Sequence, residues 1–164
     1  MSEKTFLAIK EILDKNKIVY ETLEHEPVIT SEDAAKARGV LLSVGVKAMI
    51  IKHDNGFIMI TLPADKKINF DKVKEQVQTK KIRFATLEEV KEIIDCERGG
   101  VPPFGFLFSI RTLMDKKINE NEKIEFNAGL TTKSIRMNSA DYFMIANKFK
   151  ETTIGEFAQW LQQK

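Results

Sequence analysis

The sequence predicts a mixed α/β (α+β) fold, in which one domain holds a mixed β-sheet or an open barrel with helices packed on it. Stretches with helical spacing of apolar residues alternate with apolar, β-branched runs along the chain. Two of these runs are joined by a tight turn rather than by a helix, which favours a mixed sheet over a regular parallel array. The 164 residues fit a single domain, 1–164, since one domain commonly holds roughly 100–200 residues.

The first elements are marked by helix-capping residues. Apolar residues at helical spacing over 6–13 predict a helix, and the run 18–23 predicts a strand. Thr30 stands three residues before the carboxylate of Asp33, an arrangement that satisfies free N–H groups at the start of a helix. Gly39 can end this second helix, because glycine readily takes the left-handed backbone conformation.

A hairpin is expected at the centre of the sheet. The runs 46–51 and 57–62 are apolar at nearly every position. Asn55-Gly56 lies between them and suits the positive φ angles of a tight turn. Because apolar residues do not alternate with polar ones in either run, we expect both faces of this hairpin to be covered.

The rest of the chain continues the alternation of helices and strands. Thr86 and Glu89 form a capping-box pattern, which opens a helix that ends near Asp95. Further helices are expected over 69–77, 139–146 and 154–161. Further strands, rich in β-branched and aromatic residues, are expected over 82–85, 106–110, 123–128 and 133–137.

Charge and apolar length exclude several classes of protein. The longest uncharged run, 99–110, is shorter than the ~20 residues that cross a bilayer, so no membrane partner is expected. A net charge of +2 gives no general basic field, so any contact with RNA must be local. Lysine pairs at 66–67, 80–81 and 116–117 could supply such a contact, or they could form ordinary solvated faces.

Cysteine and histidine counts predict a metal-free protein of the cytoplasm. The chain begins with no continuous apolar segment and no small-residue cleavage site, so nothing directs it to secretion. Cys96 is the single cysteine; it either packs passively or supplies a thiolate. With only His25 and His53 beside it, no zinc-type ligand set can be spaced out, and no cofactor is expected. Both histidines are interpreted as surface residues.

Lys47 is the first candidate for a functional side chain. In the strand 46–51 it shares a face with Met49 and Ile51. Burying an ammonium among apolar side chains is costly unless it is paired or meets a polar ligand. The lysine therefore either serves an anionic or polar ligand or extends along the sheet edge to reach water.

The loop 99–105 is the second candidate, with three glycines and two prolines in a chain that has few of either. Glycine lets a ligand approach the main chain and proline restricts the loop, so this backbone could form a preorganised carbonyl or oxyanion site. A structural loop before a strand is the alternative. Asn127, Gly129 and Ser134, on two neighbouring predicted strands, could line the same pocket or belong to a simple turn.

Several segments together carry a resemblance to a known family. They are Val46–Ile51, Leu62–Asp65, Gly99–Gly105, Phe126–Gly129 and Ser134–Met137. In this order they resemble the YbaK/prolyl-tRNA synthetase-associated editing domains, over a stretch from Tyr20 to Phe143. The resemblance implies a sheet curled toward an open barrel and an enzyme that hydrolyses wrongly charged aminoacyl-tRNA.

The resemblance also implies roles for single residues. Lys47 matches the functional strand lysine of the family, and Gly99 with Pro103 matches its glycine-x-x-x-proline loop. The implied catalytic residues are Lys47, Gly99, Gly100, Val101 and Pro103. The implied substrate-binding residues are Met49, Pro102, Phe104, Asn127, Gly129 and Ser134. The loop backbone would bind the substrate carbonyl, Lys47 would bind the terminal phosphate or polar substrate groups, and a terminal-ribose hydroxyl of the tRNA would assist the attack.

The implied cavity is small and apolar. Val101, Pro102 and Phe104 on the loop and Met49 on the strand are expected to rim it, which suits alanine or cysteine and excludes bulky side chains. The expected partner is the acceptor end of a tRNA of the proline type, and prolyl-tRNA synthetase is the candidate protein partner. The alternative to an enzyme is a non-catalytic module that binds tRNA or a synthetase through the same pocket.

Two positions depart from the known subgroups of the family. Members similar to the alanine editors have an asparagine and a histidine where this chain has Ala48 and Asn127. Members similar to the cysteine editors have a serine at the position of Asn127 and an aspartate at the position of Ser134. The choice between alanine and cysteine therefore stays open at the level of the sequence.

Overall fold

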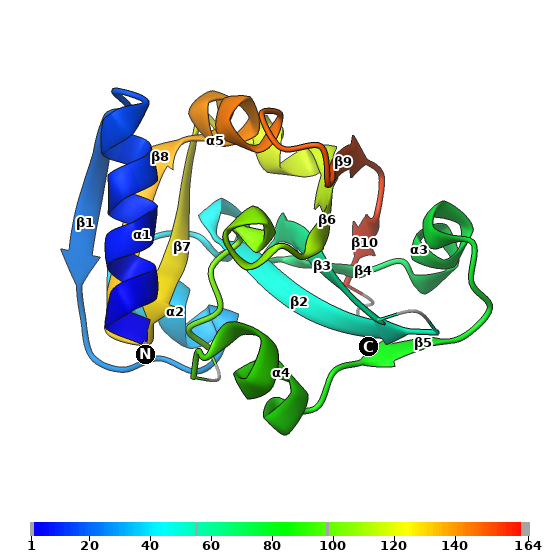
Figure 1. The fold of residues 1–164 in the computed structure, drawn as a ribbon. Coiled ribbons are helices and arrows are strands. Elements are labelled where there is room, and N and C mark those ends of the chain that lie inside the picture. Colours follow the sequence, from blue (N-terminus) through cyan, green and yellow to red (C-terminus); the bar gives the residue numbers. More distant parts are fainter. Residues whose placement is uncertain (1, 55, 98, 162–164) are drawn as a thin grey trace.

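The computed structural model describes residues 2–54, 56–97 and 99–161, and it confirms the predicted mixed α+β fold (Figure 1). The described helices are α1 (Ser2–Lys15), α2 (Ser31–Arg38), α3 (Phe70–Val77), α4 (Leu87–Ile94) and α5 (Ser139–Ala146), with short 3-10 helices η1 (Leu42–Val44), η2 (Gly105–Phe108) and η3 (Lys116–Glu120). The described strands are β1 (Tyr20–Glu24), β2 (Val46–His53), β3 (Gly56–Pro63), β4 (Lys66–Ile68), β5 (Ile82–Phe84), β6 (Arg111–Asp115), β7 (Lys123–Leu130), β8 (Lys133–Asn138), β9 (Thr152–Gly155) and β10 (Ala158–Trp160). Asn55, which the sequence places in the hairpin turn, lies outside the described residues.

The strands form three sheets in the described part of the chain. The largest has the order β5-β2-β3-β6-β9, with β2 antiparallel to β3 and β5, and with β6 parallel to β3 and β9. The second, β1-β8-β7, is antiparallel, and β10 pairs with β4 in the third. The main sheet is therefore mixed, as predicted, and the three sheets stay open instead of closing into one barrel.

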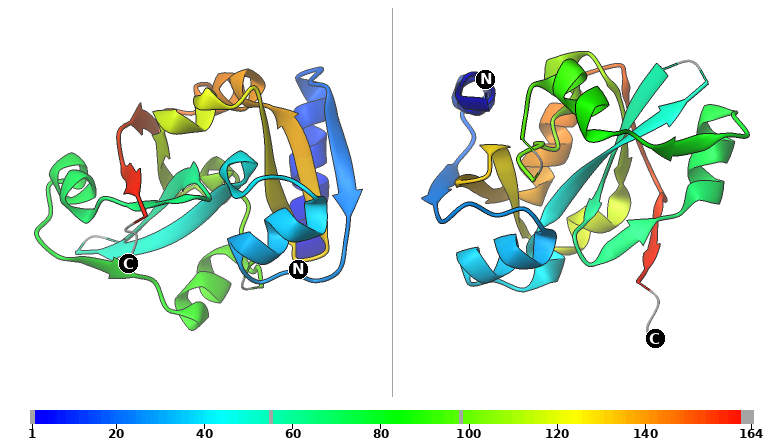
Figure 2. Two further views of the ribbon diagram at one scale, coloured as in Figure 1. Left: turned by 180° about the vertical axis from the view of Figure 1, so that it is seen from behind. Right: turned by 90° about the horizontal axis from the view of Figure 1, so that it is seen from below.

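The two larger sheets meet where β2 begins. A parallel bridge joins Gly45 to Glu125, so the start of β2 lies beside β7. Within the second sheet, Asn127 of β7 stands opposite Ser134 of β8. Two further views show that α1 and β1 lie at one end of the molecule and that α3 and β5 lie at the other (Figure 2). The junction of the sheets thus brings Lys47 close to Asn127, which is far from it in the sequence.

The central strand β2 is buried on both faces, as expected for a run without alternation. Ile51 packs in one cluster with Val73 of α3, and Ile50 packs in another with Ile94 of α4. All four side chains are at most 5% exposed, so each helix covers one face of the hairpin.

A third cluster of apolar side chains holds the end of the loop 99–105. The ring of Phe104 is fully buried and lies 5.2 Å from the ring of Phe126 and 5.5 Å from that of Tyr142, measured between centroids. The hydroxyl of Tyr142 donates a hydrogen bond of 2.7 Å to the carbonyl oxygen of Pro103. The second half of the loop is therefore fixed against the core.

The capping signals in the sequence are confirmed. Thr30 Oγ1 accepts a hydrogen bond of 3.0 Å from the backbone N–H of Asp33, and Gly39 ends α2 with a φ angle of +71°. Thr86 and Glu89 form the reciprocal capping box at the start of α4. These local interactions set where α2 and α4 begin.

The predicted strand over 106–110 is wrong. This segment contains the 3-10 helix η2, and the strand begins only afterwards, as β6. Gly105 lies so close to the strand that a Cβ there would be 2.0 Å from Oγ1 of Thr112, and Ser109 ends η2 with a φ angle of +55°. This close return of the chain onto β6 overrides the β propensity of the aromatic residues.

The predicted helix over 154–161 is also wrong, since the structure has β9 and β10 in this region. The buried carboxylate of Asp115 accepts hydrogen bonds of 2.7 Å from the backbone N–H groups of both Phe157 and Ala158. These two donors are no longer available to a helix. Pairing of β9 with β6 and of β10 with β4 then keeps the segment extended.

The strand β4 has no counterpart among the predicted elements. Its Lys66 is only 4% exposed, and the ammonium lies 3.0 Å from a carboxylate oxygen of Asp65 and 3.7 Å from the ring centroid of Trp160. Because two of the three residues of β4 are lysines, the segment has no run of apolar residues from which a strand could be predicted.

Candidate active site

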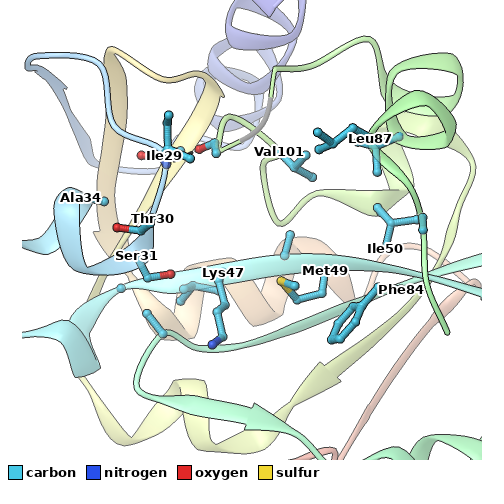
Figure 3. Close-up of a pocket in the computed structure, with 18 of the residues that line it drawn as sticks. Ile29, Thr30, Ser31, Ala34, Lys47, Met49, Ile50, Phe84, Leu87 and Val101 are labelled. Atoms are coloured by element: carbon cyan, nitrogen blue, oxygen red, sulfur yellow. Dashed lines mark hydrogen bonds between the residues drawn. The ribbon is translucent and has the colours of Figure 1, made fainter.

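A pocket of about 400 Å³ lies where α2, β2, β7 and the loop after α4 come together (Figure 3). It is lined by Ile29, Thr30, Ser31, Ala34, Arg38, Gly45, Val46, Lys47, Ala48, Met49, Ile50, Ala64, Phe84, Ala85, Leu87, Val90, Gly99, Val101 and Asn127. The sequence-predicted site residues on this lining are Lys47, Met49, Gly99, Val101 and Asn127. Those outside it are Gly100, Pro102, Pro103, Phe104, Gly129 and Ser134.

Lys47 and Met49 both line the pocket, and Figure 3 shows their side chains pointing to the side of β2 away from Val101 and Leu87. Its side chain is partly buried, and its ammonium forms no hydrogen bond or ion pair with another residue of the described ranges. Burial lowers the pKa of Lys47 from its ordinary value, and the carboxylates of Glu32 and Asp65 offset this effect only in part. The ammonium is therefore placed to meet a ligand that enters the pocket.

Gly99 brings the loop into direct contact with the chain before α2. Its φ angle is +86°, and a Cβ at this position would lie 2.8 Å from the carbonyl oxygens of both Val28 and Ile29. Such distances are too short for any side chain. Only glycine allows the loop to pass this close, which sets where the backbone of the loop faces the pocket.

Only part of the loop backbone is free to donate hydrogen bonds. The N–H of Gly100 already donates to the carbonyl oxygen of Glu97 at 2.9 Å, and the two prolines have no N–H. Among the backbone hydrogen bonds of the described residues, none uses the N–H of Gly99 or Val101. These two groups are the ones available to a substrate carbonyl or oxyanion.

Asn127 ties the loop to the second sheet. Its Nδ2 donates a hydrogen bond to the carbonyl oxygen of Gly99, and its Oδ1 accepts one of 3.0 Å from Nη2 of Arg38. Ser134 lies behind it, fully buried, and Ser134 Oγ accepts from Nε of Arg38 at 3.0 Å and lies 2.7 Å from Nε2 of His25. Ser134 therefore supports the pocket wall from the rear, and His25, interpreted from the sequence as a surface residue, belongs to this network.

Arg38 is a buried pocket residue that the sequence analysis missed. Its side chain is 4% exposed, it lines the pocket, and its Nε lies 3.9 Å from the buried carboxylate of Glu125. Burial lowers the pKa of Arg38, and the carboxylate of Glu125 acts in the opposite direction. In the sequence, Arg38 is simply a basic residue in the last turn of a short helix, which is common because it complements the helix dipole.

The remaining loop residues lie behind the pocket. Pro102, Pro103 and Phe104 are buried and do not line the pocket, and the ring of Phe104 packs in the core, so the three residues do not rim the cavity in the way expected. Gly129 has a φ angle of +92° at an irregularity of β7, and a Cβ on Gly100 would lie 3.3 Å from its carbonyl oxygen. The loop 99–105 and β7 therefore lie against each other through their main chains.

Cys96 is a free, buried thiol, and burial raises its pKa to about 11. A protonated thiol is a poor nucleophile at neutral pH. We expect Ellman's reagent to leave Cys96 unmodified in the folded protein and to modify it quickly in guanidinium chloride. Rapid modification of the native protein, together with loss of activity, would instead identify a reactive thiolate at this position.

Neither a metal cluster nor a bilayer span is found in the described ranges. Among these residues, no group of three or more His, Cys, Asp or Glu side chains could hold a metal ion. None of the described helices combines the length and the apolar character that a membrane span requires.

The fold and the pocket together define a class of protein. An ammonium without a partner, free backbone N–H groups and an amide fixed by an arginine suit a substrate with an already activated carbonyl, such as an ester. The family model of the aminoacyl-tRNA editing domain matches residues 25–145, and the chain belongs to this family. The resemblance found in the sequence and the predicted enzyme class are therefore confirmed.

The relatives include proteins named as a tRNA deacylase or an editing protein and several proline–tRNA ligases. The multifunctional Ser/Thr-tRNA deacylase ProXp-y of Escherichia coli (strain K12) is 29% identical over 140 residues, which cover 82% of this chain and 84% of that protein. The prolyl-tRNA editing protein ProX of Acetoanaerobium sticklandii is 28% identical over 97 residues, or 58% of this chain and 59% of that protein. The proline–tRNA ligase of Bacillus licheniformis is 36% identical over 92 residues, which cover 56% of this chain and 16% of the ligase.

Solved structures share the fold at low sequence identity. The hypothetical protein APE2540 has a TM-score of 0.81 at 22% identity, covering 92% of this chain and 99% of that chain. A proposed trans-editing enzyme for prolyl tRNA synthetase has a TM-score of 0.78 at 18% identity, covering 94% of this chain and 97% of that chain. The likeness extends over nearly the whole chain in both cases.

Proposed function

We propose that this chain is a trans-acting deacylase that hydrolyses tRNA mischarged with a small amino acid. The observation that carries the proposal is the ammonium of Lys47, which has no partner in the described ranges and shares one pocket with the N–H groups of Gly99 and Val101. The relative from Escherichia coli, named as a tRNA deacylase and covered by the match over 84% of its length, supports an activity of this kind.

In this mechanism the N–H groups of Gly99 and Val101 receive the ester carbonyl of the aminoacyl group. A water adds to the carbonyl carbon, and these donors stabilise the negative charge that develops on the oxygen. The bond from that carbon to the ribose oxygen then breaks, the ribose oxygen takes a proton, and the free amino acid leaves. Lys47 binds the terminal phosphate or polar groups of the substrate, and a neighbouring ribose hydroxyl positions the water.

The lining of the pocket sets the class of amino acid that it accepts. Ala34, Ala48 and Met49 give an apolar surface, while the hydroxyl-bearing residues Thr30 and Ser31 add polar groups at one side. Alanine and cysteine fit the apolar part. Serine and threonine are accepted if the hydroxyls bind the substrate side chain, and the name of the Escherichia coli relative supports including them. An apolar pocket separates such small side chains only weakly, by about 1–3 kcal/mol per methylene.

The proposal is tested by multiple-turnover deacylation of one proline-type tRNA charged in turn with alanine, cysteine, serine, threonine, proline or phenylalanine. We expect release of one or more of the four small residues, and no release of phenylalanine. Prolyl-tRNA, the correct product, should persist. Stoichiometric retention of the tRNA without release of any amino acid would identify a binding module, and equal rates for phenylalanine would show that side-chain size does not govern entry.

A further inference from the structure

A second, strongly basic cleft lies at the far end of β2 from Lys47. It is lined by Lys52, His53, Asp54, Lys74, Lys80, Lys81, Ile82 and Arg83. Five of these side chains are cations and one is a carboxylate, whereas the whole chain has a net charge of only +2. Positive charge is therefore concentrated in this cleft.

Hydrogen bonds hold the carboxylate that lines the cleft and the one that pairs with Arg83. The carboxylate of Asp54 accepts a hydrogen bond of 3.0 Å from Thr79, which fastens the end of β2 to the segment after α3. Glu89 forms two hydrogen bonds, of 2.8 and 3.1 Å, with the guanidinium of Arg83.

The lysines, in contrast, are not neutralised. Lys52, Lys74, Lys80 and Lys81 have no carboxylate oxygen within 4.0 Å among the described residues. Lys80 and Lys81 are exposed, and they are adjacent in the turn that leads into β5. Lys52 lies 4.8 Å from the ring centroid of Phe57, whereas exposed cations without an ion-pair partner, such as Lys80 and Lys81, suit a polyanion from outside.

The cleft and the candidate active site share one strand pair. β2 carries Lys47 near one end and Lys52 near the other, five residues apart, which is about 17 Å at 3.3 Å per residue and places the two side chains on opposite faces of the strand. On the neighbouring strand β5, Arg83 lines the basic cleft and the next residue, Phe84, lines the pocket. Phe84 is 48% exposed, and Figure 3 shows its ring beside Met49.

We propose that the basic cleft binds the phosphate backbone of the tRNA acceptor arm, with Phe84 as a stacking surface between the cleft and the pocket. This inference rests on the proposed function, because it assumes that the aminoacylated 3′ end lies at Lys47. The distance from Lys47 to Lys52 is one that a few unpaired nucleotides can span. An aromatic ring beside the path of the strand offers a face on which any base can stack.

The experiment replaces Lys80 and Lys81 together with glutamate. We expect about tenfold weaker binding of the full-length tRNA, measured with uncharged tRNA by fluorescence anisotropy, and a smaller dependence of the binding constant on salt. In deacylation the KM for full-length mischarged tRNA should rise by a similar factor while kcat stays the same. An aminoacylated adenosine, which is the 3′-terminal nucleoside alone and is too short to reach the cleft, should be hydrolysed at the wild-type rate.

The matched control replaces Lys4 and Lys15 of α1 with glutamate, which changes the net charge equally at the opposite end of the molecule (Figure 2). It should leave tRNA binding nearly unchanged. Equal weakening by both double variants, or wild-type binding by the Lys80 and Lys81 variant, would overturn the inference. Loss of binding only in the cleft variant, with no hydrolysis of any mischarged tRNA by the wild type, would support the cleft and contradict the proposed function.

Discussion

Replacing Lys47 with alanine should lower kcat/KM for the mischarged tRNA by about 10²–10³-fold, because it removes the ammonium that the pocket presents to the substrate. The fold should persist, since the side chain is only partly buried and the ammonium has no partner among the described residues. The measurement is single-turnover deacylation, with circular dichroism and thermal unfolding of the same samples. An activity close to that of the wild type would remove Lys47 from the site.

Lys47→Met serves as the control, because methionine keeps most of the apolar stem. It should be as inactive as the alanine variant and more stable than the wild type at neutral pH, where burial of the ammonium costs free energy. The sign of the pH dependence follows from the lowered pKa of Lys47 in the folded chain. At a pH between the folded-state pKa and the unfolded-state pKa, Lys47 is protonated in the unfolded chain and neutral in the folded one. In this range the free energy of unfolding therefore rises with pH. The free energy of unfolding is therefore higher at high pH, where Lys47 is neutral in both states, and it decreases as the pH falls through the folded-state pKa of Lys47.

Measured by urea unfolding at several pH values, the difference in stability between Lys47→Met and the wild type should therefore be largest at neutral pH and should shrink in alkaline solution. A difference that does not change with pH would show that Lys47 is not desolvated in the folded protein.

Replacing Gly99 with alanine should lower kcat/KM by about 10²-fold, the effect expected for a displacement of catalytic groups by roughly 1 Å. The new Cβ would lie 2.8 Å from the carbonyl oxygens of Val28 and Ile29, so the loop has to move away from α2. That movement weakens the bond from Asn127 to the carbonyl of Gly99 and shifts the N–H groups that face the pocket. Deacylation rates and the unfolding free energy should both be measured.

Gly39→Ala is a matched control for the backbone strain. Gly39 also has a positive φ angle, +71°, but a Cβ there would meet nothing within 4 Å. It should cost about 1 kcal/mol of stability, as expected for a left-handed residue other than glycine, and should keep its deacylation activity. If both variants lost activity to the same extent, the contact of Gly99 with Val28 and Ile29 would not be what positions the loop.

Local signals in the sequence predicted the elements that carry the site. The start of α2 follows from Thr30 and Asp33, which bond to each other, and that of α4 follows from its capping box. The run around Lys47 predicted a buried strand, because every neighbouring position is apolar. Such elements depend on residues close in the sequence, so they can be recognised without knowing the tertiary structure.

The parts that the sequence did not predict depend on contacts between distant segments. Arg38 gains its place at the pocket from bonds to Asn127 and Ser134, which are about ninety residues away. The strands β9 and β10 replace the expected helix because Asp115 captures two backbone donors. Phe104 turned out to face the core, since no local pattern distinguishes a ring that lines a pocket from one that packs behind it.

Because β1 pairs with β8, the second sheet is completed late in the synthesis of the chain. Tyr20 pairs with Met137, so this edge of the second sheet cannot close until most of the chain has been made, whereas the hairpin of β2 and β3 joins neighbouring segments and can form early. The wall of the pocket that contains Asn127 belongs to the late part. A ribosome-bound chain that ends before β8 would therefore have Lys47 on a formed hairpin but would lack the opposite wall of the pocket. The chain would become active in editing only near the completion of translation.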